Sequence, residues 1–328
     1  MFKYIAKRLL YMVFIFFVMS LVLFFLYNMI PGDPARVEVE ALKTKLEPDE
    51  YQRKYEEARK RLGLDDPTIV RYGKWISGIL QGDFGQSSVY KQPVIDVVQT
   101  PMKNTIFINM FSIVLALGIT IPLGIICAVK RNSVFDNAVQ VFTIIGYSIP
   151  VFIISLVSIY FFSVKLGWFP VSGMNTPNFE GTKIQWFFDR MYYLALPLIV
   201  MTIGSLGGMT RYVRAAMIEA LRMDYIRTAR AKGLREKVVI YSHAWRNALL
   251  PVITLIIGWF MSIFSGSLVI ERMFNLNGMG KFYIDALTNQ DYNIALAVQM
   301  FYMVLALAGN LIIDLSYGLV DPRVRVNH

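Results

Sequence analysis

Residues 104–129 read NTIFINMFSIVLALGITIPLGIICAV, and none of these 26 side chains carries a formal charge. A helix needs about 20 apolar residues to cross roughly 30 Å of hydrocarbon. This run is long enough to do so, whereas an apolar helix in the core of a soluble protein is seldom so long. The stretch therefore predicts a membrane-spanning helix, and it indicates the class of the whole chain.

Five further charge-free runs of similar length occur in the same chain. The composition agrees with a membrane protein, since 55% of the 328 residues are hydrophobic and 17% are charged, whereas soluble domains contain about a quarter charged residues. Disorder and collagen are excluded by the aromatic content of 14% and the ordinary Gly and Pro counts. The predicted spans are 9–30, 104–129, 137–164, 191–210, 247–270 and 292–313.

The first run could instead be a secretory signal peptide, because Lys3, Lys7 and Arg8 precede it. Its 22 apolar residues exceed the usual length of such a segment, about 7–15 residues, and no small-x-small cleavage site follows it before Pro31. We predict that it is retained as a span.

The orientation follows from the distribution of basic residues. The short loops on the side of the termini hold 16 Lys and Arg, against 5 on the other side once the long loop 31–103 is discounted, as the positive-inside rule requires. The net charge of +10 is thereby attributed to loops that face anionic lipid, and no nucleic-acid partner is predicted. The sequence predicts an all-α integral membrane protein with six transmembrane helices, cytoplasmic N and C termini, and a helical extracytoplasmic insertion after the first span.

Three segments follow from this topology: 1–30 as the cytoplasmic N-terminus and first span, 31–103 as the extracytoplasmic loop, and 104–328 as a five-helix transmembrane core that includes the cytoplasmic hairpin 211–246. Within the loop, Pro48 and Gly63 predict the start and stop of a helix. This helix either only connects its neighbours or forms a docking surface for an extracytoplasmic partner.

Residues 75–80, too short to span, are predicted to lie at the membrane interface. Stabilising i,i+4 pairs are expected for Glu50 with Lys54, Glu56 with Lys60, and Glu57 with Arg61.

The most informative loop is 211–246, which holds 9 Lys and Arg and only 3 acids. Residues 212–231 contain no Gly or Pro, so the fourth span is predicted to continue as a helix into the cytoplasm. Gly233 predicts a helix stop in the left-handed conformation, and a second helix over about 235–247 returns to the membrane. An apolar stripe is expected from Val213, Met217, Leu221 and Tyr225, which recur every four residues.

This basic hairpin has three interpretations: a topology determinant, a patch that binds nucleic acid or lipid, or a docking element for a cytoplasmic partner. An apolar stripe with a charged rim is what a docking element requires. The sequence therefore favours docking over the other two interpretations.

Residues 225–234 read YIRTARAKGL and residues 243–251 read HAWRNALLP. Together they resemble the cytoplasmic loop of ABC importer permeases, in the version found in the first permease subunit of the oligopeptide, dipeptide and nickel family. The resemblance extends to IPGDPA at 30–35, LGLD at 62–65, GDFG at 82–85 and DPR at 321–323, and thus covers nearly the whole chain. Compared with the general importer pattern, Arg227 replaces a Glu, and the distance from Gly233 to Leu250 and Pro251 is longer, as in the peptide branch.

The resemblance implies that 227–238 forms a coupling helix that rests in a groove of an ATP-hydrolysing subunit. Such a rigid element would convert nucleotide-driven closure into movement of the attached spans. Basic side chains of the helix are expected to pair with acids of that subunit. The implied coupling residues are Arg227, Thr228, Ala229, Arg230, Ala231, Lys232, Gly233, Leu234, Arg235 and Lys237.

The sequence contains no phosphate-binding Gly-x-x-x-x-Gly-Lys-Ser/Thr pattern. His243 and His328 are far apart in the sequence, and Cys127 is the only cysteine, so neither a catalytic group nor a metal site is predicted. The chain is expected to be a non-catalytic subunit without a cofactor of its own, with ATP and Mg bound by partner subunits.

Polar residues and prolines inside the spans are candidates for the translocation path, although such groups more often only bond neighbouring helices. Gly204, Gly207 and Gly208 are expected to allow close helix packing. Asp314 is expected to be an interfacial partner of Arg323, Arg325 or a basic hairpin residue. The path candidates are Tyr147, Pro150, Ser262, Ser265 and Asn310.

The predicted function is that of a permease subunit of an ATP-driven importer for short peptides, in the cell membrane of a bacterium or archaeon. The resemblance implies as partners a second homologous permease, two cytoplasmic ATPase subunits and an extracytoplasmic substrate-binding protein. Nickel or a metal chelate is the alternative cargo. An ion-coupled secondary carrier is disfavoured because charges are nearly absent from the spans, and a membrane scaffold that recruits a partner without transport is the remaining alternative.

Overall fold

The computed structural model describes the backbone of residues 2–30 and 32–320, and the side chains of 6–30, 32–40 and 42–313. Over these residues the chain is helical, apart from loops and one isolated antiparallel bridge between Gln86 and Pro93. It forms two compact units, one built from the segments before residue 104 and over 278–311, the other centred on 104–277. The expected pairing of Asp314 with Arg323 or Arg325 lies outside the described residues.

Each of the six predicted spans corresponds to apolar helix in the structure. Five are single helices long and apolar enough to cross a membrane, and the sixth is a pair of helices bent by 99°. The five are Ala6–Met29, Val94–Val129, Lys183–Leu221, Glu236–Phe264 and Tyr292–Ile313, and the bent pair is Val134–Ser148 with Val151–Lys165.

The third predicted span, 137–164, contains a sharp bend between two helices. Helix α7 (Val134–Ser148) ends before Ile149, whose backbone is extended with φ −80° and ψ 125°. Pro150 then begins α8 (Val151–Ser158), which continues as the π-helix η2 (Ile159–Lys165). The cause is local, because a proline forces the preceding residue out of the helical region.

The fifth span ends earlier than the predicted residue 270. Helix α12 (Arg246–Met261) is followed by the 3-10 turn η4 (Ser262–Phe264) and by Ser265, which is extended with ψ 119°. A separate short helix, α13 (Leu268–Met273), follows. The predicted span continued across this break because it was defined by the absence of charge. Ser265, Gly266 and Ser267 carry no charge.

The first unit combines α1 (Phe2–Met29) with the loop helices α2 (Pro34–Val39), η1 (Glu40–Leu42), α3 (Pro48–Arg61), α4 (Thr68–Leu80) and α5 (Val94–Val97). Helices α14 (Met279–Thr288) and the start of α15 (Tyr292–Val320) complete it. Helix α4 packs on α1, since the hydroxyl oxygens of Ser20 and Tyr72 are 2.9 Å apart and the rings of Phe24 and Trp75 lie 5.3 Å apart. The predicted interfacial segment 75–80 is therefore the end of a short helix fixed to a span.

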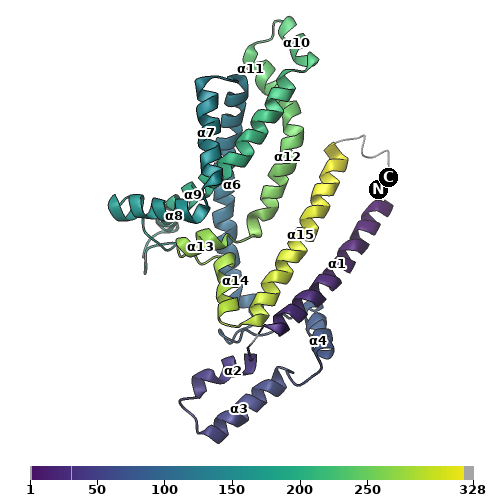
Figure 1. Ribbon diagram of the computed structural model, residues 1–328, viewed down its shortest axis with the longest axis vertical. Coiled ribbons are helices and arrows are strands. Elements are labelled where there is room, and N and C mark those ends of the chain that lie inside the picture. Colours follow the sequence, from purple (N-terminus) through teal and green to yellow (C-terminus); the bar gives the residue numbers. More distant parts are fainter. Residues whose placement is uncertain (1, 31, 321–328) are drawn as a thin grey trace. The chain divides into compact units, whose positions relative to one another are not determined.

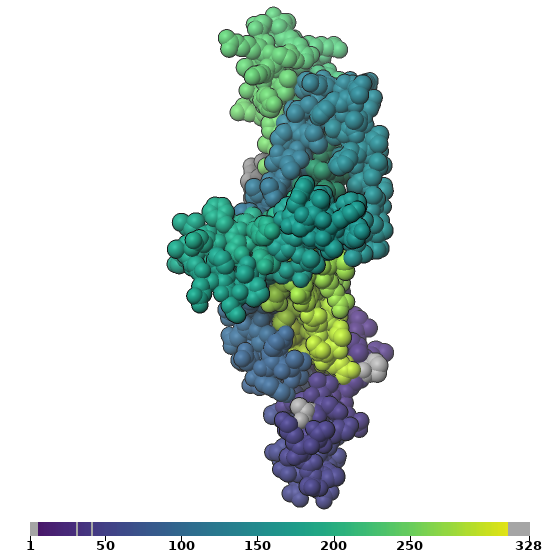
Figure 2. Space-filling view, turned by 90° about the vertical axis from the view of Figure 1, so that its left-hand side faces the viewer, coloured from purple at the N-terminus to yellow at the C-terminus, as the bar shows by residue number. Residues whose placement is uncertain are grey.

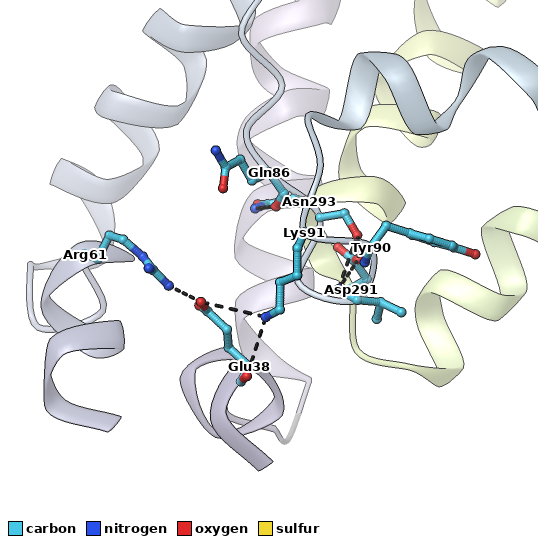
Figure 3. Close-up of polar contacts among 9 residues, drawn as sticks. Glu38, Arg61, Gln86, Tyr90, Lys91, Asp291 and Asn293 are labelled. Carbon is cyan, nitrogen blue, oxygen red and sulfur yellow. Dashed lines mark hydrogen bonds and ion pairs between the residues drawn. The ribbon is translucent and has the colours of Figure 1, made fainter. Parts of the chain in front are cut away.

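Ion pairs in the loop differ from the expected i,i+4 pattern. Lys54 pairs with Glu57 at 2.9 Å, and Glu38 contacts both Arg61 and Lys91, which come from separate segments of the loop (Figure 3). The loop is also tied to the start of α15, where Asp291 accepts hydrogen bonds from Ser87 and from the backbone of Val89. Lys54 thus has a partner three residues away in its own helix, whereas the partners of Glu38 are set by packing between separate segments.

The second unit is built around α6 (Gln99–Val129), α7, α9 (Lys183–Leu221) and α12 (Figure 1). Two glycines allow close approach. A Cβ added at Gly124 would lie 2.7 Å from the Cβ of Val213, and one added at Gly207 would lie 2.6 Å from the Cβ of Tyr147. Of the three glycines expected to permit close packing, Gly204 and Gly208 face open space. Figure 2 shows the segment from α8 to the start of α9 as a lobe of this unit.

Candidate functional site

The hairpin between the fourth and fifth spans begins where α9 ends, at Leu221. After Arg222 and Met223, a new helix, α10, covers Asp224–Ala231. The break changes which side chains face inward. Tyr225, expected to extend the apolar stripe, is 39% exposed, and the next residue, Ile226, is fully buried in its place.

Helix α10 is held to the rest of the unit by its inner face. Ile226 and Ala229 belong to a buried cluster with Met217 of α9 and with Val239 and Ala244, which follow the hairpin turn. Burying such apolar side chains stabilises a contact by about 25 cal/mol per Å² of area removed from water. The hairpin is therefore a packed element rather than a loose loop, and in Figures 1 and 2 it projects at one end of the unit.

A tight turn separates α10 from the returning helix. Gly233 has φ +74°, and an added Cβ would meet nothing within 4 Å, so the backbone conformation, and not space, requires glycine here. The N–H of Leu234 donates to the carbonyl of Ala229 at 3.4 Å, the long-range bond of a Schellman-type helix end. The predicted glycine stop is confirmed. The implied continuous helix over 227–238 is wrong, because the turn lies between Ala231 and Glu236.

Two of the five basic residues implied to be coupling residues, Arg227 and Arg230, have acidic partners within the chain. Arg230 bridges the turn to Glu236 with contacts of 2.6 Å (Nη2 to Oε1) and 3.3 Å (Nε to Oε2). This hydrogen bond raises the pKa of the Arg230 guanidinium. Arg227 lies 3.5 Å from Asp224 in the same helix. These two arginines, expected to pair with a partner protein, thus already have acidic neighbours within the chain, and only the Arg230 pair crosses the turn.

The other three basic coupling residues are exposed to solvent. Lys232, Arg235 and Lys237 are exposed and form no ion pair with any residue whose side chain the structure describes. The hairpin also exposes apolar and aromatic side chains, each by 39–55%. They are Tyr225, Leu234, Val238 and Tyr241. The hairpin therefore presents a mixed basic and apolar surface, the composition of a protein docking site with a charged rim.

The hairpin continues into the fifth span without interruption. Helix α11 (Glu236–Val238) passes into the π-helix η3 (Val239–Trp245) and then into α12. The predicted second helix over 235–247 is thus the first part of a longer helix. Both arms of the hairpin are therefore continuous with, or packed on, the long helices α9 and α12.

A buried ion pair connects α9 to α7 near the same end of the unit. The carboxylate of Asp136, fully buried, accepts from Arg214 at 2.7 Å (Nε) and 2.6 Å (Nη2) and from the backbone N–H of Asn132 at 2.9 Å. Sequence analysis missed this pair. The available signal was the position of Asp136, directly before the charge-free run 137–164.

A polar cavity of about 210 Å³ lies among α6, α9 and α12. Asn109 donates hydrogen bonds to the carbonyls of Ile263 and Ser265, both at 2.8 Å, where α12 ends. Of the predicted path residues, Ser262 lines this cavity, whereas Tyr147 and Pro150 do not and Asn310 belongs to the other unit. The cavity is also lined by polar residues that the sequence analysis did not select, namely Asn109, Ser112 and Ser205.

Comparison with known proteins identifies the family. Residues 120–326 match the model described as binding-protein-dependent transport system inner membrane component, and residues 1–117 match the model of the N-terminal part of such membrane components. The chain belongs to this family.

Full-length relatives agree with the assignment. The oligopeptide transport system permease protein AppB of Bacillus subtilis is 38% identical over 322 residues, which cover 98% of each chain. The glutathione transport system permease protein GsiC of Escherichia coli is 33% identical over 325 residues, which cover 99% of each chain. Among solved structures, a chain of the inward-facing MetNI methionine ABC transporter matches with a TM-score of 0.48 and 17% identity, covering 68% of this chain and 97% of that one.

As an inner membrane component, the permease places its apolar helices in a lipid bilayer. Its exposed surface fits this environment, since only 11% of the apolar window of α1 is buried and side chains such as Leu10 and Phe14 are 71% and 65% exposed. In water these groups would promote aggregation, whereas in a bilayer they contact lipid tails.

Proposed function

We propose that this chain is a transmembrane permease subunit of an ATP-driven importer for short peptides. It forms half of the translocation pathway, with a second homologous permease as the other half. The observation that carries the proposal is the full-length similarity to permeases named for oligopeptide and glutathione transport. Oligopeptides and glutathione are both short peptides, which supports peptide cargo over nickel or a metal chelate.

The orientation and the segment roles belong to the same proposal. Both termini and the hairpin 211–246 face the cytoplasm, as the basic short loops favour, and the loop 31–103 faces the outside. There it receives substrate from an extracytoplasmic binding protein. The predicted division into 1–30, 31–103 and 104–328 describes these roles. The compact units differ from it, because residues 278–311 group with the N-terminal segments.

The hairpin is proposed to dock on one of two cytoplasmic ATPase subunits. Three features support it: the apolar inner face that fixes α10, the turn at Gly233, and the free basic groups Lys232, Arg235 and Lys237 beside exposed apolar side chains. ATP and Mg are bound by those subunits, and the permease itself performs no chemistry. Closure of the ATPase pair would move the hairpin and, with it, α9 and α12.

The proposal is tested by the ATPase activity of the complex co-purified with this chain, in lipid nanodiscs with the binding protein. Stimulation by a mixed pool of short peptides is expected. Stimulation by nickel chelates and not by peptides would contradict peptide cargo, and the absence of any associated ATPase would favour a secondary carrier or a scaffold.

A matched pair of variants tests the coupling role. Gly233→Pro is expected to abolish ATP-coupled uptake, because proline cannot adopt the positive φ of this turn. Gly233→Asn, which tolerates that conformation, is expected to retain most uptake. Normal uptake by the proline variant, at equal membrane levels, would contradict the coupling role.

A further inference from the structure

A second cavity, of about 290 Å³, lies within the first unit. Its walls come from the ends of α1 and α15, from the start of α2, and from α3 and α4. This volume is near the lower end of the range for small-molecule pockets. The residues that give it chemical character are Tyr27, Asp33, Arg59, Arg71, Trp75 and Tyr292.

Positive charge predominates in this cavity. Arg59 is paired with Asp65 at 2.7 Å and lies 3.7 Å from Asp33. Asp33 is itself engaged, since it caps α2 by accepting from the N–H of Ala35 at 3.0 Å. Arg71, by contrast, has no hydrogen bond or ion pair with any side chain in the described part of the chain. Its guanidinium is thus a cation of the cavity that lacks an acidic partner among the described residues.

The surroundings of Arg71 are only partly open to water. Burial lowers the pKa of its guanidinium, Asp66 acts in the opposite direction, and Arg59 lowers it further. A half-buried guanidinium without a hydrogen-bonded acceptor is unfavourable. An anion placed in the cavity would relieve this cost for Arg71.

Tyr292 supplies a second unused donor. Its hydroxyl oxygen is buried and has no hydrogen-bond partner among the described residues. Buried hydroxyl groups in proteins are almost always hydrogen-bonded. The cavity thus contains a hydroxyl and a guanidinium without partners among the described residues. Both groups can donate hydrogen bonds to a phosphate or a similar oxyanion.

The position of the cavity relative to the membrane indicates the source of such an anion. Phe24, which lines it, is five residues inside the end of α1 at Met29, which corresponds to about 8 Å along a helix. Trp75 and the two tyrosines are residue types enriched at headgroup depth. Helix α4 also exposes Ile69 and Leu80, by 60% and 63%, apolar groups suited to contact with acyl chains.

We propose that this cavity binds the phosphodiester headgroup of a membrane phospholipid, with Arg71 and Tyr292 as donors and the Phe24 and Trp75 rings beside the glycerol region. The ligand fixes α4 against α1 and so orders the loop that follows the first span. The inference does not depend on the cargo or on the ATPase partners.

The test uses the full-length chain in its purified assembly, stripped of lipid and titrated with short-chain phosphatidylglycerol, with native mass spectrometry as readout. We expect Arg71→Gln to weaken binding of the tightest lipid about tenfold and Arg71→Lys to weaken it less. Tyr292→Phe is expected to weaken binding as well. Arg53→Gln, which removes an exposed arginine from the same loop, is the matched control and should leave binding unchanged.

Three outcomes would overturn the proposal. The first is equal lipid binding by wild type and Arg71→Gln, with both assemblies intact by size-exclusion chromatography. The second is displacement of the lipid by short peptides, which would assign the cavity to cargo. The third is a site filled by inorganic phosphate alone, which would identify a free anion as the ligand. If Tyr292→Phe raises the thermal midpoint without changing lipid binding, the hydroxyl is simply unsatisfied and is not a ligand contact.

Discussion

Arg214 and Asp136, which are 78 residues apart in the sequence, form a two-point ion pair in which the carboxylate is fully buried. The same carboxylate caps the turn between α6 and α7 through the N–H of Asn132. One acidic side chain therefore holds three segments of the second unit together. Removing its cationic partner leaves a buried charge uncompensated, which is the costly case for buried ion pairs.

We expect Arg214→Ala to destabilise the permease by about 3–5 kcal/mol. Cys127 is the only cysteine of the chain and is fully buried, so its reaction with a thiol-reactive dye reports unfolding nearby. The variant should unmask Cys127 at a lower temperature than wild type. Arg131→Ala, which removes an exposed arginine from the adjacent turn, is the control. Equal unmasking temperatures for the two variants would contradict the structural role of the pair.

The Arg230–Glu236 contact predicts a charge-swap result. Both side chains are about half exposed, so the contact contributes no more than about 1 kcal/mol. Arg230→Glu should place two acids across the turn and increase cleavage by chymotrypsin after Tyr225 or Leu234, sites that neither variant alters. The double variant Arg230→Glu with Glu236→Arg should restore protection. Protection unchanged in the single variant would show that the contact does not hold the turn.

Lys232 and Lys237 are expected to act on a partner protein instead. The variant Lys232→Glu with Lys237→Glu should weaken co-purification of the ATPase subunits, because opposite charges on the partner would become like charges. Thermal stability of the permease should not change. Lys130→Glu with Arg131→Glu alters the net charge equally on the same side of the membrane and serves as control. Equal loss in both double variants would indicate a non-specific charge effect.

The glycines of the fourth span predict opposite effects at neighbouring positions. Alanine at Gly207 would place its Cβ 2.6 Å from the Cβ of Tyr147 and 2.8 Å from the carbonyl oxygen of Thr143, so α7 and α9 must move apart at a cost of about 1–3 kcal/mol. Gly204→Ala meets nothing within 4 Å and should be neutral or slightly stabilising. Thermal midpoints in detergent measure both, and equal midpoints would contradict the close packing.

Asn109 predicts a local effect on the end of the fifth span. Its amide donates to two carbonyls at 2.8 Å, of Ile263 and Ser265. Asn109→Leu keeps a similar volume but leaves these carbonyls without that donor, which costs about 1–3 kcal/mol. Hydrogen exchange over 258–268 should speed up, while exchange in α10 stays as in wild type. Unchanged exchange over 258–268 would mean that other groups hold this break.

The positions of the long apolar helices could be predicted because each is a run without charge whose length the bilayer sets; the structure has five single candidate spans and one bent pair. Helix ends were less predictable. No Gly or Pro marks the break at Arg222 and Met223, and the register of α10 is set by Ile226 entering a cluster built from distant helices. The bend at Ile149 has a local cause, the following proline, and a kink at Pro150 could be predicted from that residue type.

Within the candidate site, the glycine stop and the basic, partly apolar surface could be predicted, since both depend on residue type at a known position. Pairing could not. Arg230 meets Glu236 only because the turn brings them together, and Arg214 meets Asp136 only because α7 packs on α9. Likewise, which of the three neighbouring glycines contacts α7 depends on the rotation of α9 about its axis.

The π-helix η3 (Val239–Trp245) lies between the turn at Gly233 and the membrane helix α12 and allows this segment to change in length. A π turn closes its hydrogen bond one residue later than an α turn, so it stores an extra residue inside a continuous helix. Insertion or deletion of a single residue between Gly233 and Pro251 can therefore be absorbed by converting α turns to π turns or the reverse. The spacing within this loop can thus change while the packed turn and the membrane helix keep their separate contacts.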